Sequence, residues 1–134
     1  MFTYRFHGLL WLTVALLIPA ADARPPMPLG HHGGLVTQCT EPSFFEETPG
    51  KEAQVTTLEK FSFTASDNTE PDYLEAWVNL QPVALTITPQ RSGRLTVEGK
   101  LAAPITEGRA WIKVIGYSRD GCELIHTWNV YAGH

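Results

Sequence analysis

Residues 110–131 read AWIKVIGYSRDGCELIHTWNVY, and they contain two runs rich in strand-forming residues separated by a polar turn. The runs span residues 110–117 and 122–131, and a Ser-Arg-Asp-Gly sequence at residues 118–121 lies between them. Asp-Gly is a strong hairpin signal, because glycine tolerates the positive φ that a tight turn requires. This stretch therefore predicts a β-hairpin near the end of the chain.

The strand pattern extends back through the chain. Short stretches with a period of two recur, and apolar residues nowhere repeat at helical spacing for long enough to form a helix. Turns about every ten residues are typical of an antiparallel sandwich, and a closed barrel is the alternative. We predict an all-β fold, a single antiparallel Ig-like β-sandwich of about seven to eight strands. Besides the hairpin, the expected strands are residues 36–39, 43–46, 60–65, 73–80, 83–88 and 94–101.

The first 35 residues of the chain have a different composition. Arg5 precedes an apolar run at residues 8–17, and the small-x-small sequence Ala-Asp-Ala follows at residues 21–23. The run is shorter than the roughly 18 to 20 residues of a membrane-spanning helix, so it predicts an export signal without a stable membrane anchor. We expect a periplasmic or extracellular protein. The predicted organisation is a cleaved signal peptide at 1–23, a flexible Pro/Gly/His arm at 24–35 and an Ig-like β-sandwich domain at 36–134.

Composition and motifs exclude two classes of function. The 134 residues are 43% hydrophobic and 18% charged, which is typical of one globular domain. Lys and Arg number 10 against 14 Asp and Glu, without a basic cluster, so we predict no nucleic-acid partner. The sequence contains no Gly-x-Ser-x-Gly, His-Glu-x-x-His or phosphate-binding loop, and we predict that the protein is not an enzyme.

The two cysteines of the sequence are Cys39 and Cys122. In an oxidising compartment, an even pair far apart in sequence predicts a disulfide bond. The bond would tie the N-terminal segment to the last strand. Two free thiols are the alternative.

Several turns carry a family resemblance. The relevant stretches are TPGKEAQV at 48–55, FSFT at 61–64, LTITP at 85–89 and YSRDGC at 117–122. Their layout over residues 43–131 resembles that of CopC-type periplasmic copper-binding domains. These are small seven-stranded sandwiches with a Pro-Gly turn after the first strand and a Ser-x-Asp-Gly-His turn before the last. The resemblance implies a sandwich fold and copper binding, with Asp120 at a ligand position. The family's N-terminal His has no counterpart at its expected place, and Cys122 replaces the turn His.

Histidines supply the other candidate metal ligands. His31 and His32 are adjacent and flanked by glycine, so both imidazoles could reorient onto one ion. We predict them as the primary ligands of a transition metal, foremost Cu(II), with Asp120 and His126 as partners from the domain. A solvated arm is the alternative for the pair. His126 shares a face with Leu124, Trp128 and Val130, which favours a hydrogen-bonded histidine at the edge of the core unless a metal ion binds. A blue-copper loop at Cys122 and His126 is disfavoured, because the segment continues as a strand and no Met follows.

An acidic stretch is a candidate calcium site. Asp67, Asn68, Glu70 and Asp72 could supply oxygen ligands to Ca²⁺. A solvated turn is the alternative, because Asp and Asn are favoured in turns for backbone reasons.

Exposed aromatic residues would suit a recognition surface, and Phe44, Phe45 and Tyr73 are the candidates. The main prediction is an exported, non-catalytic Ig-like module that recognises a protein, peptide or glycan partner. The alternative is a periplasmic carrier of copper, or of another transition metal, that resembles CopC and uses His31 and His32. No resident cofactor is predicted, Cu(II) and Ca(II) being the candidate ions.

Overall fold

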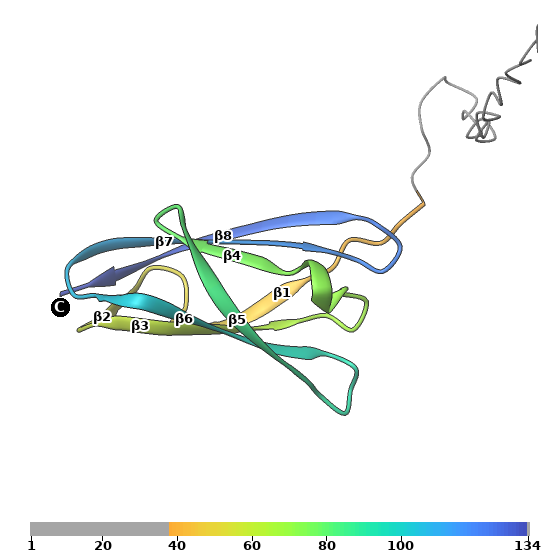
Figure 1. The fold of residues 1–134 in the computed structure, drawn as a ribbon, viewed down its shortest axis with the longest axis horizontal. Coiled ribbons are helices and arrows are strands. Elements are labelled where there is room, and N and C mark those ends of the chain that lie inside the picture. Colours follow the sequence, from red (N-terminus) through yellow and green to blue (C-terminus); the bar gives the residue numbers. More distant parts are fainter. Residues whose placement is uncertain (1–37, 134) are drawn as a thin grey trace, which may run out of the picture. The chain divides into compact units, whose positions relative to one another are not determined.

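The computed structural model describes residues 38–133, which form eight strands and one short 3-10 helix (Figure 1). The predicted signal at 1–23 and the predicted arm at 24–35, with both of its histidines, lie outside the described residues. No helix within residues 38–133 is long and apolar enough to cross a membrane. The elements are β1 (Phe44–Thr48), β2 (Ala53–Val55), β3 (Leu58–Ala65), η1 (Pro71–Tyr73), β4 (Glu75–Val78), β5 (Gln81–Pro89), β6 (Leu95–Ile105), β7 (Gly108–Tyr117) and β8 (Glu123–Ala132).

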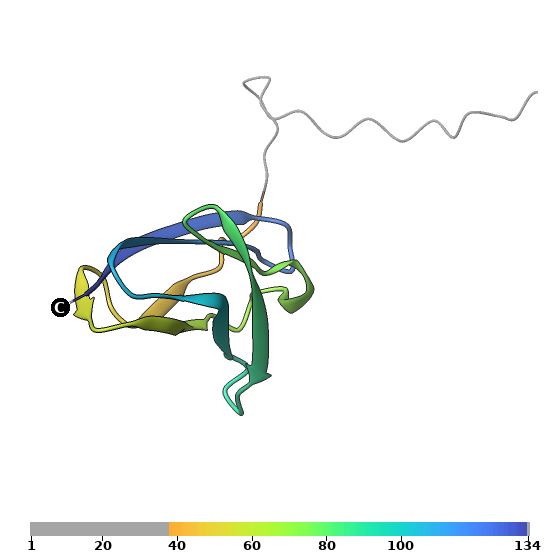
Figure 2. The ribbon, with the colours of Figure 1, turned by 60° about the vertical axis from the view of Figure 1, so that its left-hand side comes forward.

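The strands form two layers in the order β1-β3-β6-β5-β4-β7-β8-β2. Strand β5 joins the layers, because residues 81–83 pair with β4 whereas residues 84–89 pair with β6. Figures 1 and 2 show β5 crossing from one layer to the other. All pairs are antiparallel except β2 with β8, which is parallel. The predicted all-β, Ig-like sandwich is confirmed.

Alternation along the strands builds the core between the layers. In β7, alternate residues from Ala110 to Gly116 are buried, and their neighbours face outward. The ring of Phe61 packs edge-on against Trp128 at 5.7 Å between centroids. Phe61 also covers Gly99 on the neighbouring strand so closely that a side chain there would meet the ring. These contacts fix the spacing of the layers and the positions of the loops at their ends.

Three local expectations are wrong. Residues 38 and 39 form no strand, and β2 was not expected at all. The stretch at 73–80 divides into the end of η1, strand β4 and a tight turn at Asn79 and Leu80, whose φ values are +47° and +68°. The Asn79 side chain holds this turn by donating to the Arg109 carbonyl and accepting from the Trp111 amide. Strand β4 therefore ends at a turn that contains no glycine and that the Asn79 side chain holds through its hydrogen bonds to β7.

Candidate functional site

Most of the predicted site residues of the domain meet at one end of the sandwich. The loop that precedes η1 and the β7–β8 turn are joined by a bridge between Thr69 and Ser118. The amide of Glu70 donates to the Tyr117 carbonyl at 2.8 Å, and the amide of Arg119 donates to the Asn68 carbonyl at 2.9 Å. The candidate calcium residues and the turn that contains Asp120 are thus neighbours, although about fifty residues separate them.

A third segment is tied to this end by a disulfide bond between Cys39 and Cys122, whose Cα atoms lie 5.5 Å apart. The predicted bridge is confirmed. Beside it, Asp120 accepts hydrogen bonds on both carboxylate oxygens, from the Ser118 hydroxyl at 2.5 Å and from the Thr40 amide at 3.0 Å. The Ser118 bond, followed by the Thr40 bond, lowers the pKa of Asp120 below its ordinary value. Asp120 therefore acts as a clamp between the turn and the N-terminal segment.

The candidate calcium residues do not form a cation cage. The side-chain oxygen of Asn68, Oδ1, accepts a hydrogen bond from the Ser66 hydroxyl at 2.6 Å. The side-chain nitrogen, Nδ2, donates to the backbone carbonyls of Thr40 and Glu41. These bonds engage Asn68 in holding the loop. Within residues 38–133, no three His, Cys, Asp or Glu side chains are grouped closely enough to hold a metal ion. Calcium binding by Asp67, Asn68, Glu70 and Asp72 stays a prediction.

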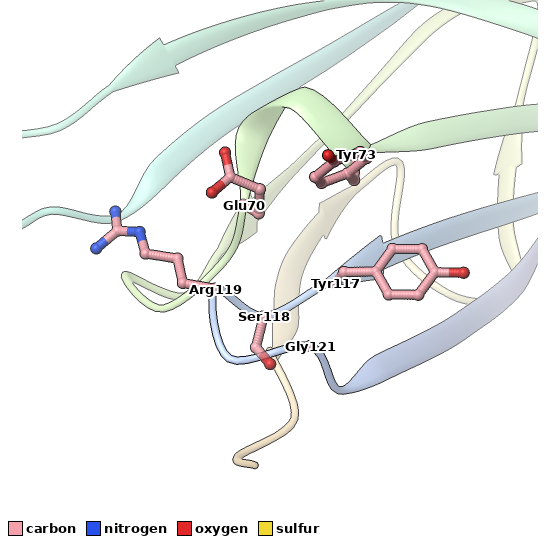
Figure 3. Close-up of a pocket in the computed structure, with 6 residues that line it drawn as sticks. All are labelled: Glu70, Tyr73, Tyr117, Ser118, Arg119 and Gly121. Atoms are coloured by element: carbon pink, nitrogen blue, oxygen red, sulfur yellow. The ribbon is translucent and has the colours of Figure 1, made fainter. Parts of the chain in front are cut away.

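A pocket of about 440 Å³ opens beside the turn (Figure 3). Tyr73 and Tyr117 contribute an edge-to-face ring pair with centroids 6.3 Å apart, and Tyr73 is 64% exposed. The Tyr117 hydroxyl donates to Glu123, and this hydrogen bond raises the pKa of Tyr117 above its ordinary value. Figure 3 shows the Arg119 side chain on the far side of the pocket from the Tyr117 ring, with Glu70 between them. The pocket therefore combines aromatic surface with both signs of charge.

The predicted aromatic patch is not continuous. Phe44 is buried in the core, so its expected exposure is wrong, because this position in β1 faces the other layer. Phe45 is half-buried under the Arg94 guanidinium, which lies 5.2 Å from the ring centroid. Tyr73 is the exposed member and lines the pocket. Partner binding through Phe45 and Tyr73 stays a prediction.

His126 lies away from the turn, on the inner face of β8. Its Nε2 is 2.5 Å from the Glu47 carboxylate, and the two side chains are 18% and 15% exposed. Burial acts to raise the pKa of Glu47, but hydrogen bonds from its own backbone and from His126, with the charges of His126 and Lys51, lower it below the ordinary value. The expected hydrogen-bonded histidine at the edge of the core is confirmed.

Sequence reasoning missed Glu47 as the partner of His126. Simple alternation from Phe44 would turn Glu47 outward, away from the core. A β-bulge between Phe45 and Thr48 interrupts the pairing with β3, and Glu46 adopts a φ of +57° within it. The bulge shifts the alternation so that Glu47 points inward, and no glycine marks it in the sequence.

The turn at residues 118–121, which resembles the CopC turn, does not offer a set of copper ligands while the disulfide bond is present. Cys122 replaces the family's turn His, and its sulfur is bonded to Cys39. Both oxygens of Asp120 accept hydrogen bonds. Among the described residues, no hydrogen bond or ion pair joins Asp120 to His126. The structure thus shows no contact between Asp120 and His126, and the other two predicted metal ligands, His31 and His32, lie outside the described residues.

Comparison with known proteins finds likeness in structure and none in sequence. No protein-family model matches the chain, and no curated protein matches it in sequence. PcoC from Escherichia coli, a methionine-rich copper resistance protein, has a TM-score of 0.56 at 16% identity over 69% of this chain and 99% of its own. A selenomethionine form of PcoC has a TM-score of 0.51 at 15% identity, over 67% and 98% of the two chains. CopC from Methylosinus trichosporium OB3b has a TM-score of 0.49 at 15% identity, over 68% and 92%. The resemblance predicted from the turns is confirmed at the level of the fold: this chain has the β-sandwich of the PcoC copper resistance protein.

Proposed function

We propose that this protein is an exported, non-catalytic copper-binding protein whose primary ligands are His31 and His32. The observation that carries the proposal is the shared fold with PcoC, a copper resistance protein. The adjacent imidazoles provide the donor type that Cu(II) favours. The copper ion is the cargo of the protein, and no reaction is assigned to it.

The ligand chemistry differs from that of a methionine-rich protein. The sequence contains two methionines, Met1 and Met27, so thioethers cannot form a cluster of ligands. His126 is the domain-side candidate with a ring nitrogen to offer: Nε2 faces Glu47, and Nδ1 forms no hydrogen bond with another described residue. Asp120 would first have to release the Thr40 amide or the Ser118 hydroxyl. We therefore propose that His31 and His32 dominate the affinity and that Asp120 contributes less than His126.

Export is part of the same proposal. The disulfide between Cys39 and Cys122 supports an oxidising compartment, either the periplasm or the extracellular space. The signal at residues 1–23 predicts a mature chain that begins at Arg24. Intact-mass analysis of the exported protein tests this start, and retention of residues 1–17 would contradict it.

A second candidate function rests on the pocket at Tyr73 and Tyr117. Its aromatic pair, with Arg119 and Glu70, suits a peptide, protein or glycan that offers both apolar and polar groups. This function requires no metal. Tyr73→Ala would weaken such a partner's binding and leave copper binding unchanged.

Elemental analysis separates the candidates. The mature protein is exposed in turn to Cu(II), Zn(II) and Ca(II), freed of unbound ion and analysed for metal. We expect about one equivalent of copper, and much less in a His31→Ala/His32→Ala variant. An Asp67→Asn/Glu70→Gln variant is the matched control, because it removes charge from the candidate calcium site and leaves the imidazoles. Equal copper in all three proteins would remove the histidine pair from the proposal, and copper-free wild type would leave the partner-recognition module.

A further inference from the structure

The outer face of the layer formed by β4, β7, β8 and β2 carries apolar and aromatic side chains among its polar ones, whereas a solvated sheet face is mostly polar. Figure 1 shows β4, β7 and β8 side by side in this layer. Alternation in β7 turns Trp111, Lys113, Ile115 and Tyr117 outward, opposite the buried residues of the strand. Ile125 stands beside Ile115 in the register and is 53% exposed. The β7–β8 face is the outward surface formed by these residues of β7 and β8 and by their neighbours on β4 and β2.

The outer face of the other layer shows what an ordinary solvated sheet looks like in this protein. There the register places Lys60 beside Lys100, Ser62 beside Glu98, and Thr86 on the far side of Glu98. Lys60 and Glu98 form an exposed ion pair at 3.6 Å. Two faces of one sandwich thus differ in chemistry, and the difference marks the β7–β8 face as a contact surface.

Charge is distributed along the β7–β8 face from one end to the other. Arg109 lies at the start of β7 and Lys113 near its middle, whereas Glu75 pairs with Ile115 and Glu123 pairs with Tyr117 toward its end. Lys113 lies over the Trp77 ring at 5.2 Å. None of Arg109, Lys113, Glu75 and Glu123 forms an ion pair with another residue in the range 38–133. A partner that reversed this order of charges would complement the face.

A second copy of the same chain provides that reversal. A twofold axis that lies between the two faces, parallel to the sheet and perpendicular to the strands, runs the partner's strands in the opposite direction. If the axis passes over β7 at Val114, Lys113 lies opposite the partner's Ile115, and the partner's Glu75 follows one strand to the side in the same row. The row of Trp111 then meets the row of Tyr117. Face-to-face sheet packing would bury the aromatic rings and pair opposite charges in the same arrangement.

The size of the face sets the strength of the contact. Strands β7 and β8 have ten residues each, and β4 and β2 add short flanks. At about 3.3 Å per residue and 4.8 Å between strands, the footprint is about 430 Å² per copy. Over both partners the footprint is about 860 Å², which is below the roughly 1,000 Å² that a specific, stable interface needs. The expected dimer is therefore weak and reversible, with a dissociation constant on the order of micromolar.

We propose that the β7–β8 face is the interface of a twofold-symmetric homodimer of this protein. The dimer goes beyond the copper proposal and does not depend on it, because its contacts involve neither of the described copper candidates, Asp120 and His126. Its formation is therefore measured with a chelator present, so that failure of either proposal leaves the other untouched.

The test is sedimentation equilibrium of the mature protein over a range of concentrations, with two charge reversals. Lys113→Glu and Glu75→Lys should each weaken dimerisation about tenfold or more, because each places like charges opposite one another twice. An equimolar mixture of the two variants should dimerise about as well as wild type, because both contacts then join opposite charges. The matched control is Lys60→Glu on the other face, which should leave dimerisation unchanged. Circular dichroism checks that each variant is folded.

Three results would overturn the proposal. The first is a wild-type protein that stays monomeric up to millimolar concentration. This result would count against the dimer even if the β7–β8 face then proved to bind a glycan or a peptide. The second is a dimer that survives both charge reversals, since it would use another surface. The third is failure of the mixed variants to recover, since the loss would then come from local damage and not from the Lys113–Glu75 contact.

Discussion

Removal of the disulfide should cost this domain a large part of its stability while leaving its native structure unchanged. The bond joins residues separated by 83 positions and so closes almost the whole described domain into one loop. In the chain-entropy model, a loop of this length contributes about 4.5 kcal/mol by restricting the unfolded chain. Domains of this size have a total free energy of unfolding of about 5–15 kcal/mol. The Cys39→Ser/Cys122→Ser variant should therefore unfold at a temperature roughly 20 °C lower or more.

Native contacts should hold the N-terminal segment in place in this variant. The Thr40 amide still donates to Asp120, and the Ser43 amide still donates to the Ser66 hydroxyl at 2.8 Å. The amide NMR spectrum should therefore change only near the two substituted positions.

The assay is guanidinium unfolding followed by tryptophan fluorescence, with wild type measured both oxidised and reduced. Reduced wild type should match the double variant, which separates loss of the bond from the effect of the new side chains. Asp120→Asn is the control, because it weakens the neighbouring clamp and keeps the covalent bond, and it should cost less. A double variant within about 1 kcal/mol of oxidised wild type would refute the entropic argument.

Two further substitutions test the core and the buried pair. Gly116→Ala places a methyl group 2.6 Å from the Phe44 ring, and it should cost about 1–3 kcal/mol in chemical unfolding, whereas Gly50→Ala meets its nearest atom at 3.7 Å and should cost much less. The folded-state pKa of Glu47 lies below its ordinary value of 4.5, so its stabilising effect is complete above that pH and is lost as the pH falls through the folded-state pKa. The stability advantage of wild type over Glu47→Gln should therefore shrink below about pH 4.5, and an advantage that grew with acidification would contradict the pairing with His126.

Local patterns were enough to predict the sandwich. Alternating residues on either side of the Asp-Gly turn specify the β7–β8 hairpin, because hairpin pairing depends on neighbouring sequence. The short strand β2 could not be found in this way. It pairs in parallel with β8, about 77 residues later, and three residues carry too little periodicity to mark a strand.

The candidate site was predictable in composition but not in arrangement. Asp120 and Asn68 were singled out as oxygen ligands, whereas the structure shows them clamping the N-terminal segment through the Thr40 backbone. Tertiary hydrogen bonds of this kind join residues 28 and 80 positions apart, which a local pattern cannot reveal. Glu47 was missed because the bulge at Glu46 reverses the alternation of β1.

The central claim is that His31 and His32 bind copper on a protein with the PcoC fold. Calorimetric titration of Cu(II) at pH 7 into the mature wild type and into the His31→Ala/His32→Ala variant tests it most directly. Neutral imidazole is the binding form, so the wild-type affinity should also fall as the pH drops through about 6.5. We expect one site in wild type and a large loss of affinity in the variant. Equal binding to both proteins, or no binding to wild type, would contradict the claim.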